Sequence, residues 1–327
     1  MYGVVYNTVD GDLQLSGGAF NAFDISTAVY SQNFSVEAQD DAPRGIAFNA
    51  DGTKMFIVGD VGDDVNEYTL STGFNVSTSS FVDSFSVNAQ DTQPTGIAFN
   101  IDGTKMFVVG NSGQDINEYT LSTGFDVSTA SFVDAFSVSS QETSPRGVAF
   151  NTNGTKMFVV GDAGDDVNEY TLSTGFDVST ASFVDAFSIS AQETLPYDLT
   201  FNTDGTKMFI AGIVGQAIYE YTLSTGFDVS TSVYSQSFSV ASQDTQPTGI
   251  AFNTDGSKMF FVGNISFNVN EYSIGTTAIP TGYQPVHTTQ STDTTYWTDI
   301  NSMTADQAAG DGNVYYAIST DDRTTWT

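Results

Sequence analysis

The sequence contains no cysteine and very few basic residues. Its 327 residues include 8 lysines and arginines against 39 aspartates and glutamates, which gives a formal net charge of −31 at pH 7. Without cysteine, the chain has no disulfides and no thiolate chemistry. An anionic surface repels nucleic acid and anionic membranes, because phosphate binding needs lysine and arginine side chains. The composition therefore predicts an acidic protein with no nucleic-acid partner and no membrane insertion.

Histidine is also nearly absent, since His287 is the only one. This excludes a Ser-His-Asp triad from the repeated segment described next and makes a histidine-rich zinc site impossible. The D-x-D-x-D-G spacing of a calcium loop is missing as well. No apolar run approaches the roughly 18 to 20 residues that a membrane-spanning helix needs. We expect no catalytic residues, no metal site and no cofactor.

What the sequence does contain is one segment repeated five times. The copies begin at Pro43, Pro94, Pro145, Pro196 and Pro247, so the period is a constant 51 residues. A period of about 40 to 50 residues is typical of solenoids, propellers or arrays. The first copy holds four runs rich in β-branched and aromatic residues between turn signals, "GIAFN", "KMFIVG", "VNEYTLS" and "SFVDSFSV". The pattern predicts four strands per copy, named A to D in chain order.

The two ends of the repeated segment complement each other. Residues 22–42 match only the C–D connection and strand D, whereas the last copy supplies strands A, B and C and then departs from the pattern at Thr276. Pairing strand D of residues 29–36 with strand C of residues 269–274 completes a fifth blade and leaves no open strand edge. The sequence thus predicts an all-β fold, a five-bladed β-propeller of four-stranded antiparallel blades with 3+1 closure.

Two further segments lie outside the repeats. We divide the chain into an N-terminal arm of residues 1–21, the propeller of residues 22–275 and a C-terminal tail of residues 276–327. The tail contains "NVYYAISTDDRTTW", which predicts a β-hairpin around Asp321 and Asp322. We expect a short β-rich tail that begins a further module, or a chain that is a fragment of a longer protein.

The repeat motif resembles known propeller repeats. "P-x-G-I-A-F-N-x-D-G-T-K-M-F-V-V-G" followed by "V-N-E-Y" is similar to YVTN and NHL-like repeats, and "NEYTLSTGFDVST" resembles repeats of large marine phage and bacterial surface proteins. The resemblance covers residues 22–275 and implies a location on a virion or at the cell surface. It also implies a cell-surface glycan, a receptor protein or other subunits of the assembly as partners. Propellers host enzymes, lectins and scaffolds alike.

Lys54 and Glu67 recur without exception in all five copies. In the predicted hairpin of strands B and C they fall on one face of the sheet, near each other. We interpret them as a cross-strand ion pair that every blade needs. The alternative is a ring of five glutamates that serve as metal ligands or general bases.

The copies differ at the residue after the proline and in the loop between strands B and C. Arg44 and Arg146 follow the proline in copies one and three only. These two copies alone carry aspartate at both the first and fourth loop positions, namely Asp60, Asp63, Asp162 and Asp165. The joint occurrence predicts structural ion pairs between each arginine and its loop. The alternative is an anion site built from the two arginines.

Copies four and five carry apolar and aromatic residues where the other copies are mostly polar. Aromatic side chains offer stacking area for a sugar or a protein side chain. In a propeller the B–C and D–A loops lie on one face of the ring, which we name the B–C face. The predicted ligand-binding residues on this face are Tyr197, Ile213, Tyr219, Ile265 and Phe267. The alternative is that this sector covers the N-terminal arm or the tail.

These observations favour a non-enzymatic binding module, the receptor- or glycan-binding part of a phage tail or surface protein. A structural or assembly protein, in which the ring is a spacer or decoration without a ligand, is the alternative. A propeller hydrolase that uses aspartate and glutamate with a metal is the least favoured, because His287, outside the repeats, gives little support to a comparison with propeller lactonases.

Overall fold

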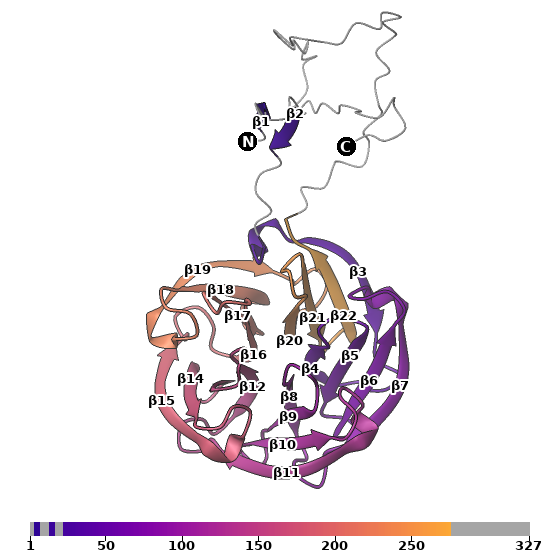
Figure 1. Cartoon of the computed structure of the whole chain (residues 1–327), viewed down its shortest axis with the longest axis vertical. Helices are drawn as coiled ribbons and strands as arrows, with labels where there is room; N and C mark the ends of the chain where they lie inside the picture. The colour runs from indigo at the N-terminus through magenta and orange to yellow at the C-terminus, as the bar shows by residue number, and fades with distance from the viewer. Residues whose placement is uncertain (1–2, 7–12, 17–21, 276–327) are drawn as a thin grey trace, which may run out of the picture. The chain divides into compact units, whose positions relative to one another are not determined.

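A computed structural model describes residues 3–6, 13–16 and 22–275. Residues 22–275 form five four-stranded antiparallel sheets arranged as the blades of a β-propeller (Figure 1). The predicted fold class is therefore confirmed for this part of the chain. Separately, β1 (Gly3–Tyr6) and β2 (Leu13–Ser16) pair as a two-stranded antiparallel sheet. The predicted tail hairpin lies outside the described residues.

The blades share one strand order, with strand A innermost and strand D at the rim (Figure 1). Strands A start at the repeat proline: β4 (Pro43–Phe48), β8 (Pro94–Phe99), β12 (Pro145–Phe150), β16 (Pro196–Phe201) and β20 (Pro247–Phe252). Strands B start at the repeated lysine: β5 (Lys54–Gly59), β9 (Lys105–Gly110), β13 (Lys156–Gly161), β17 (Lys207–Gly212) and β21 (Lys258–Gly263). We number the blades 1 to 5 in the order of these strands.

The outer half of each blade consists of strands C and D. Strands C are β6 (Asp64–Leu70), β10 (Asp115–Leu121), β14 (Asp166–Leu172), β18 (Ala217–Leu223) and β22 (Asn268–Ser273). Strands D are β7 (Ser79–Ser86), β11 (Ala130–Ser137), β15 (Ala181–Ser188), β19 (Ser232–Ser239) and, for blade 5, β3 (Val29–Ser35). A short 3-10 helix precedes each strand D: η1 (Ile25–Thr27), η2 (Val76–Thr78), η3 (Val127–Thr129), η4 (Val178–Thr180) and η5 (Val229–Thr231).

The ring closes by pairing the two ends of the repeated segment. Strand β3 pairs antiparallel with β22, with Phe34 opposite Val269 and Tyr30 opposite Tyr272. Figure 1 shows this as the indigo β3 beside the orange β22. The predicted 3+1 closure is therefore confirmed, and blade 5 has the same four strands as the others.

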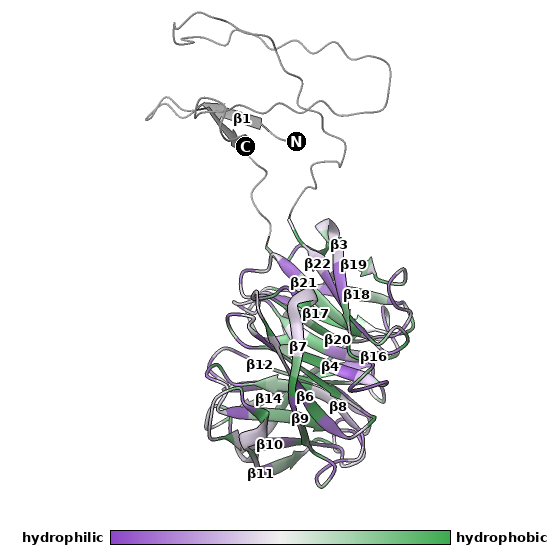
Figure 2. Ribbon diagram, turned by 90° about the vertical axis from the view of Figure 1, so that its right-hand side faces the viewer, coloured by the Kyte–Doolittle hydropathy of each residue, from purple (hydrophilic) through white to green (hydrophobic). Residues whose placement is uncertain are grey.

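The hydrophobic core lies between neighbouring blades. One cluster joins Ile46, Met55 and Tyr68 of blade 1 to Phe260 and Val262 of blade 5. Each of the other four clusters likewise spans two blades. Strands B are buried on both faces while strands D are mostly exposed, and Figure 2 shows the hydrophobic colour concentrated on inner strands such as β17 and β20. Burial between blades explains why the inner strands read as nearly continuous apolar runs.

An aromatic trio recurs at every blade interface. In blade 1, Phe48 and Phe74 pack on Phe260 of blade 5, with ring centroids 4.6 and 6.2 Å from the Phe260 ring. The Phe74 ring covers Gly52 in the A–B turn, where an added Cβ would lie 2.3 Å from the ring. Gly52 also has a φ of 69°, a left-handed value that favours glycine. The Asp-Gly turn is therefore required by the packing of the interface as well as by the turn itself.

The repeated lysine and glutamate connect each blade to the next. Lys54 Nζ lies 2.7 Å from Glu67 Oε1 and also donates to the carbonyl oxygen of Phe125 in blade 2. Glu67 Oε2 accepts a hydrogen bond of 3.1 Å from the Val127 N–H at the start of η3. The same ion pair forms in all five blades. The structural interpretation of this pair is confirmed, and we name the arrangement the interblade latch.

Removing a latch carboxylate should destabilise the ring. In blade 2, Glu118→Ala leaves Lys105 without its partner at 2.6 Å and the Val178 N–H without its acceptor at 3.0 Å. Breaking a buried pair costs about 3 to 5 kcal/mol, and the partial exposure of Lys105 reduces this to roughly 2 to 3 kcal/mol. Urea denaturation measures the change. Asp134→Ala, an exposed carboxylate opposite Glu118 on β11, is the control, and equal effects of the two substitutions would contradict the latch.

Candidate functional site

The central channel is lined by the five strands A, whose backbones approach one another closely at their third residue. These residues are Gly45, Gly96, Gly147, Asp198 and Gly249. A Cβ added to Gly45 would lie 3.0 Å from the Gly96 Cα, and one added to Gly147 would lie 2.7 Å from the Asp198 Cα. Neighbouring backbones thus approach too closely for side chains around most of this level. The channel is narrowed here by the main chain, and one position alone carries a side chain.

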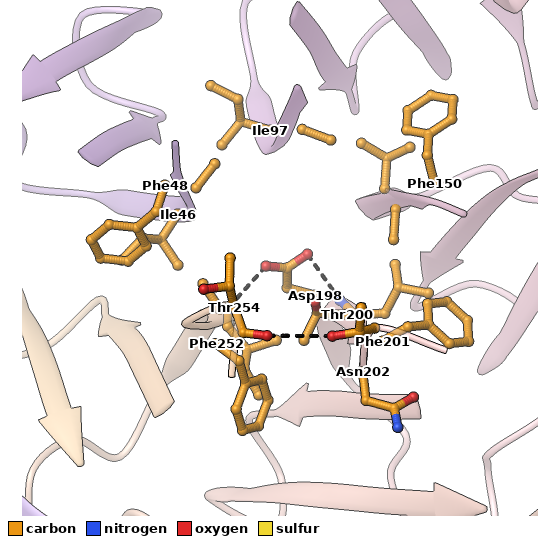
Figure 3. A pocket seen from close by; sticks show the side chains of 18 of the residues that line it. Ile46, Phe48, Ile97, Phe150, Asp198, Thr200, Phe201, Asn202, Phe252 and Thr254 are labelled. Carbon is orange, nitrogen blue, oxygen red and sulfur yellow. Dashed lines mark hydrogen bonds between the residues drawn. The ribbon is translucent and has the colours of Figure 1, made fainter. Parts of the chain in front are cut away.

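Asp198 is that exception. Its Oδ1 accepts a hydrogen bond of 2.9 Å from the Leu199 N–H, and its Oδ2 accepts one of 2.9 Å from the Ile250 N–H of blade 5. Only 6% of the residue is exposed. Burial raises the pKa of Asp198 to about 8, although the two N–H groups act in the opposite direction. Figure 3 shows the carboxyl group in the middle of the ring of strands A.

A cavity of about 340 Å³ adjoins Asp198 on the side where strands A lead into the A–B turns (Figure 3). Its wall includes one apolar side chain from each blade: Ile46, Ile97, Val148, Leu199 and Ile250. Asn49 and Asn202 lie nearer the turns. We name this space the channel cavity. Its volume falls in the usual range for small-molecule sites, and its wall combines apolar side chains with polar groups and the Asp198 carboxyl group.

The opposite end of the channel, where strands A begin, holds a cation–π cluster. The guanidinium carbons of Arg44 and Arg146 lie 5.7 and 4.8 Å from the centre of the Tyr197 ring. Arg44 Nη2 is 3.1 Å from Asp60 Oδ2, and Arg146 Nη2 is 2.8 Å from Asp162 Oδ2. The predicted ion pairs between each arginine and its loop are therefore confirmed. An anion site at the two arginines stays a prediction.

The structure separates the five residues predicted to bind a ligand on the B–C face. Tyr197 is buried at the channel, and Tyr219 is buried beneath the loop of blade 4. Ile213 and Phe267 are partly buried, whereas Ile265 is 54% exposed. The residues therefore do not form one exposed aromatic surface. Whether the sector binds a ligand stays a prediction.

Tyr219 is buried because blade 4 lacks a polar pair that other blades have. In blade 1, Asn66 Nδ2 donates to Asp64 Oδ1 at 2.8 Å. Blade 4 has Ala217 and Tyr219 at these two positions, and the tyrosine ring fills the space. Burial, together with the charge of Glu193 and a hydrogen bond to it, raises the pKa of the Tyr219 hydroxyl to about 12. The aromatic substitution in this copy is thus explained by packing.

Asp198 was not among the residues predicted from the sequence. Its signal is nevertheless present, because "PYDLT" breaks the "P-x-G-I-A" pattern of strand A in copy four. Thr200 in the same strand replaces the alanine of the other copies and also lines the channel cavity. Because the copies differ most in their B–C loops, those loops hide the smaller difference in the strand that faces the channel.

Within residues 3–6, 13–16 and 22–275, no three histidine, cysteine, aspartate or glutamate side chains are grouped so that they could hold a metal ion. The same residues contain no helix with the length and apolarity needed to cross a bilayer.

Comparisons with known proteins show similarity to other solved structures. A functionally unknown protein from Desulfotomaculum acetoxidans matches with a TM-score of 0.42 and 14% identity, over 68% of this chain and 62% of that chain. A luciferin-regenerating enzyme matches with a TM-score of 0.47 and 13% identity, over 77% of this chain and 96% of that one. A nidogen/laminin complex matches with a TM-score of 0.45 and 12% identity, over 68% and 72%. These weak similarities carry no argument about function.

No protein-family model matches the sequence, and no curated protein matches it.

The raised pKa of Asp198 predicts a specific pH dependence of stability. Between its ordinary value of 3.8 and about 8, the folded protein keeps a proton that the unfolded chain loses. The contribution of Asp198 to the free energy of unfolding should therefore fall as pH rises through this window, by up to about 1.4 kcal/mol per pH unit, and level off above it. Urea denaturation of wild type and Asp198→Gly between about pH 5 and 8 isolates the contribution of Asp198, because the contributions of the other carboxyl groups cancel in the difference between the two proteins. If the difference in free energy of unfolding between the two proteins stays constant with pH, the raised pKa of Asp198 is contradicted.

Burial also predicts unequal contributions to stability from two residues of the B–C face. Tyr219 is 7% exposed and Ile265 is 54% exposed. Tyr219→Ala should lower the free energy of unfolding by roughly 2 to 4 kcal/mol, since it leaves a cavity. Ile265→Ala should change it by less than about 0.5 kcal/mol. Chemical denaturation distinguishes these outcomes. If Tyr219→Ala leaves the free energy of unfolding unchanged, a surface role of Tyr219 is favoured instead.

Proposed function

We propose that this propeller is a non-enzymatic binding module whose ligand site is the channel cavity. The observation that carries the proposal is a space of about 340 Å³ that is lined by the inner strands of the ring and adjoins the level at which their backbones approach closely. Apolar side chains from five different blades face it, so a ligand with an apolar body would lose its contact with water on several sides.

The fold favours a preformed site. Each strand A is hydrogen-bonded to its strand B, and each blade is held to its neighbour by the interblade latch. The wall of the cavity therefore has little freedom to lose when a ligand enters, which reduces the entropic cost of binding. The side-chain amides of Asn49 and Asn202, nearer the turns, are hydrogen-bonded within the A–B turns and hold the rim of the cavity in place.

A second candidate is a receptor- or glycan-binding role through the B–C face. It is favoured by the exposed apolar side chains of Val214 and Ile265 in the loops of blades 4 and 5. A glycan or receptor partner and a location on a virion or at a cell surface rest on the resemblance of the repeats. A structural ring that binds no ligand is the contrasting possibility.

The channel-cavity proposal can be tested with octan-1-ol as an apolar probe. We expect calorimetry to detect saturable binding and NMR to show shifts of the amides of Ile46, Ile97 and Val148. Ala149→Phe places a large side chain in the cavity and should weaken binding at least about tenfold, or roughly 1.4 kcal/mol. Ala135→Phe, on the exposed strand β11, is the matched control and should leave binding unchanged.

Three outcomes would contradict the proposal. The first is a failure of octan-1-ol to bind, and the second is binding that survives Ala149→Phe. The third is binding that shifts amides of the B–C loops instead of strands A, which would support the second candidate.

A further inference from the structure

We propose that the channel cavity selects ligands with a cationic group, such as a primary ammonium, at one end of an apolar body, and that Asp198 recognises this group. The inference rests on the proposed function and specifies the chemical class of the ligand. It follows from the position of Asp198, from the lack of a paired cation beside it and from the charge of the whole protein.

Asp198 is held in place but keeps acceptor capacity. An ionised carboxylate has two oxygens with about four lone-pair positions. The Leu199 and Ile250 N–H groups use one position on each oxygen. They fix the carboxylate between blades 4 and 5, so its remaining positions can accept hydrogen bonds from a ligand. The glycines at the same level leave room for this one side chain.

No protein cation is left to pair with Asp198 within residues 22–275. All five lysines there form latch pairs with glutamates. Both arginines there, Arg44 and Arg146, pair with Asp60 and Asp162. A carboxylate in an apolar space is costly unless a cation compensates it, and charge-assisted hydrogen bonds are the strongest that it can form. A ligand with an ammonium group would supply the positive charge that the protein does not place beside Asp198.

The remaining charges act in the same direction. A formal net charge of −31 attracts cations and repels anions. The overall charge therefore opposes the approach of a carboxylate-bearing ligand of the same shape, and Asp198 opposes its binding in the cavity. A neutral ligand is a genuine competitor, because burial raises the pKa of Asp198 to about 8 and the free protein holds the carboxyl group protonated at neutral pH. A cationic ligand lowers this pKa when it binds and releases that proton. Measurements at about pH 8.5 avoid this cost.

The experiment compares three probes with the same eight-carbon body on the full chain. Octylamine, octan-1-ol and octanoate are titrated by calorimetry at about pH 8.5, where the amine is still charged, in about 0.15 M salt to screen the overall field. We expect octylamine to bind at least about tenfold tighter than octan-1-ol, and octanoate to bind more weakly than either. Asp198→Asn should reduce the ratio of octylamine to octan-1-ol affinity to about one.

Two further variants keep the test decisive. Asp198→Gly restores the residue found in the other four copies and should remove the preference even if the asparagine variant folds poorly. Asp134→Asn removes an equal charge from the exposed strand β11 and should preserve the preference.

The outcomes separate the two proposals. Equal binding of octylamine and octan-1-ol, or a preference for octanoate, would overturn the cation inference while the channel cavity remained a binding site. A preference for octylamine that survives both Asp198 variants would also overturn it, since the attraction would then come from the protein's overall charge. Failure of all three probes to bind would count against the proposed function as well.

Discussion

The structure depends on a buried glutamate in each blade that pairs with the lysine of its own blade. In four of the five blades this glutamate also accepts a backbone N–H of the next blade. Glu67 pairs with Lys54 of its own blade and accepts the Val127 N–H of the next blade, while Lys54 also donates to the neighbouring Phe125 carbonyl. A carboxylate placed between blades is costly unless all its partners are present. Each blade is therefore completed by its neighbour, and a chain with an open ring would leave one latch without its backbone partners.

Ring closure and channel geometry follow from this constraint. Lys207 donates to the carbonyl oxygen of Phe23 at 3.0 Å, so the segment before β3 takes part in the same contact as the internal repeats. With the blades fixed, the strands A converge so closely that four of their five third residues are glycine. Asp198 is tolerated there because the other four positions have no side chains. A single carboxyl group on the axis is thus a consequence of four glycines.

The two ends of the channel differ in chemistry although the repeats are almost identical. At the end where strands A begin, Arg44 and Arg146 stack on Tyr197 and are neutralised by loop aspartates. At the other end, apolar residues surround a space that adjoins an uncompensated carboxyl group. Substitutions at two adjacent positions of one copy, Tyr197 and Asp198, separate these two environments. A few substitutions in copies one, three and four are sufficient to break the symmetry of the ring.

The sequence by itself determined the repeat, the strand order and the closure, because hairpin turns, strand alternation and a 51-residue period are local patterns. It also indicated the Arg44 partnership through joint occurrence. Only the tertiary structure decided that Tyr219 is buried and that Asp198 reaches Ile250, 52 positions away along the chain. Such contacts depend on how many blades surround the axis and how closely they approach. A buried tyrosine and an exposed one look the same in a sequence, since burial is set by neighbours that the chain brings together only when the ring closes.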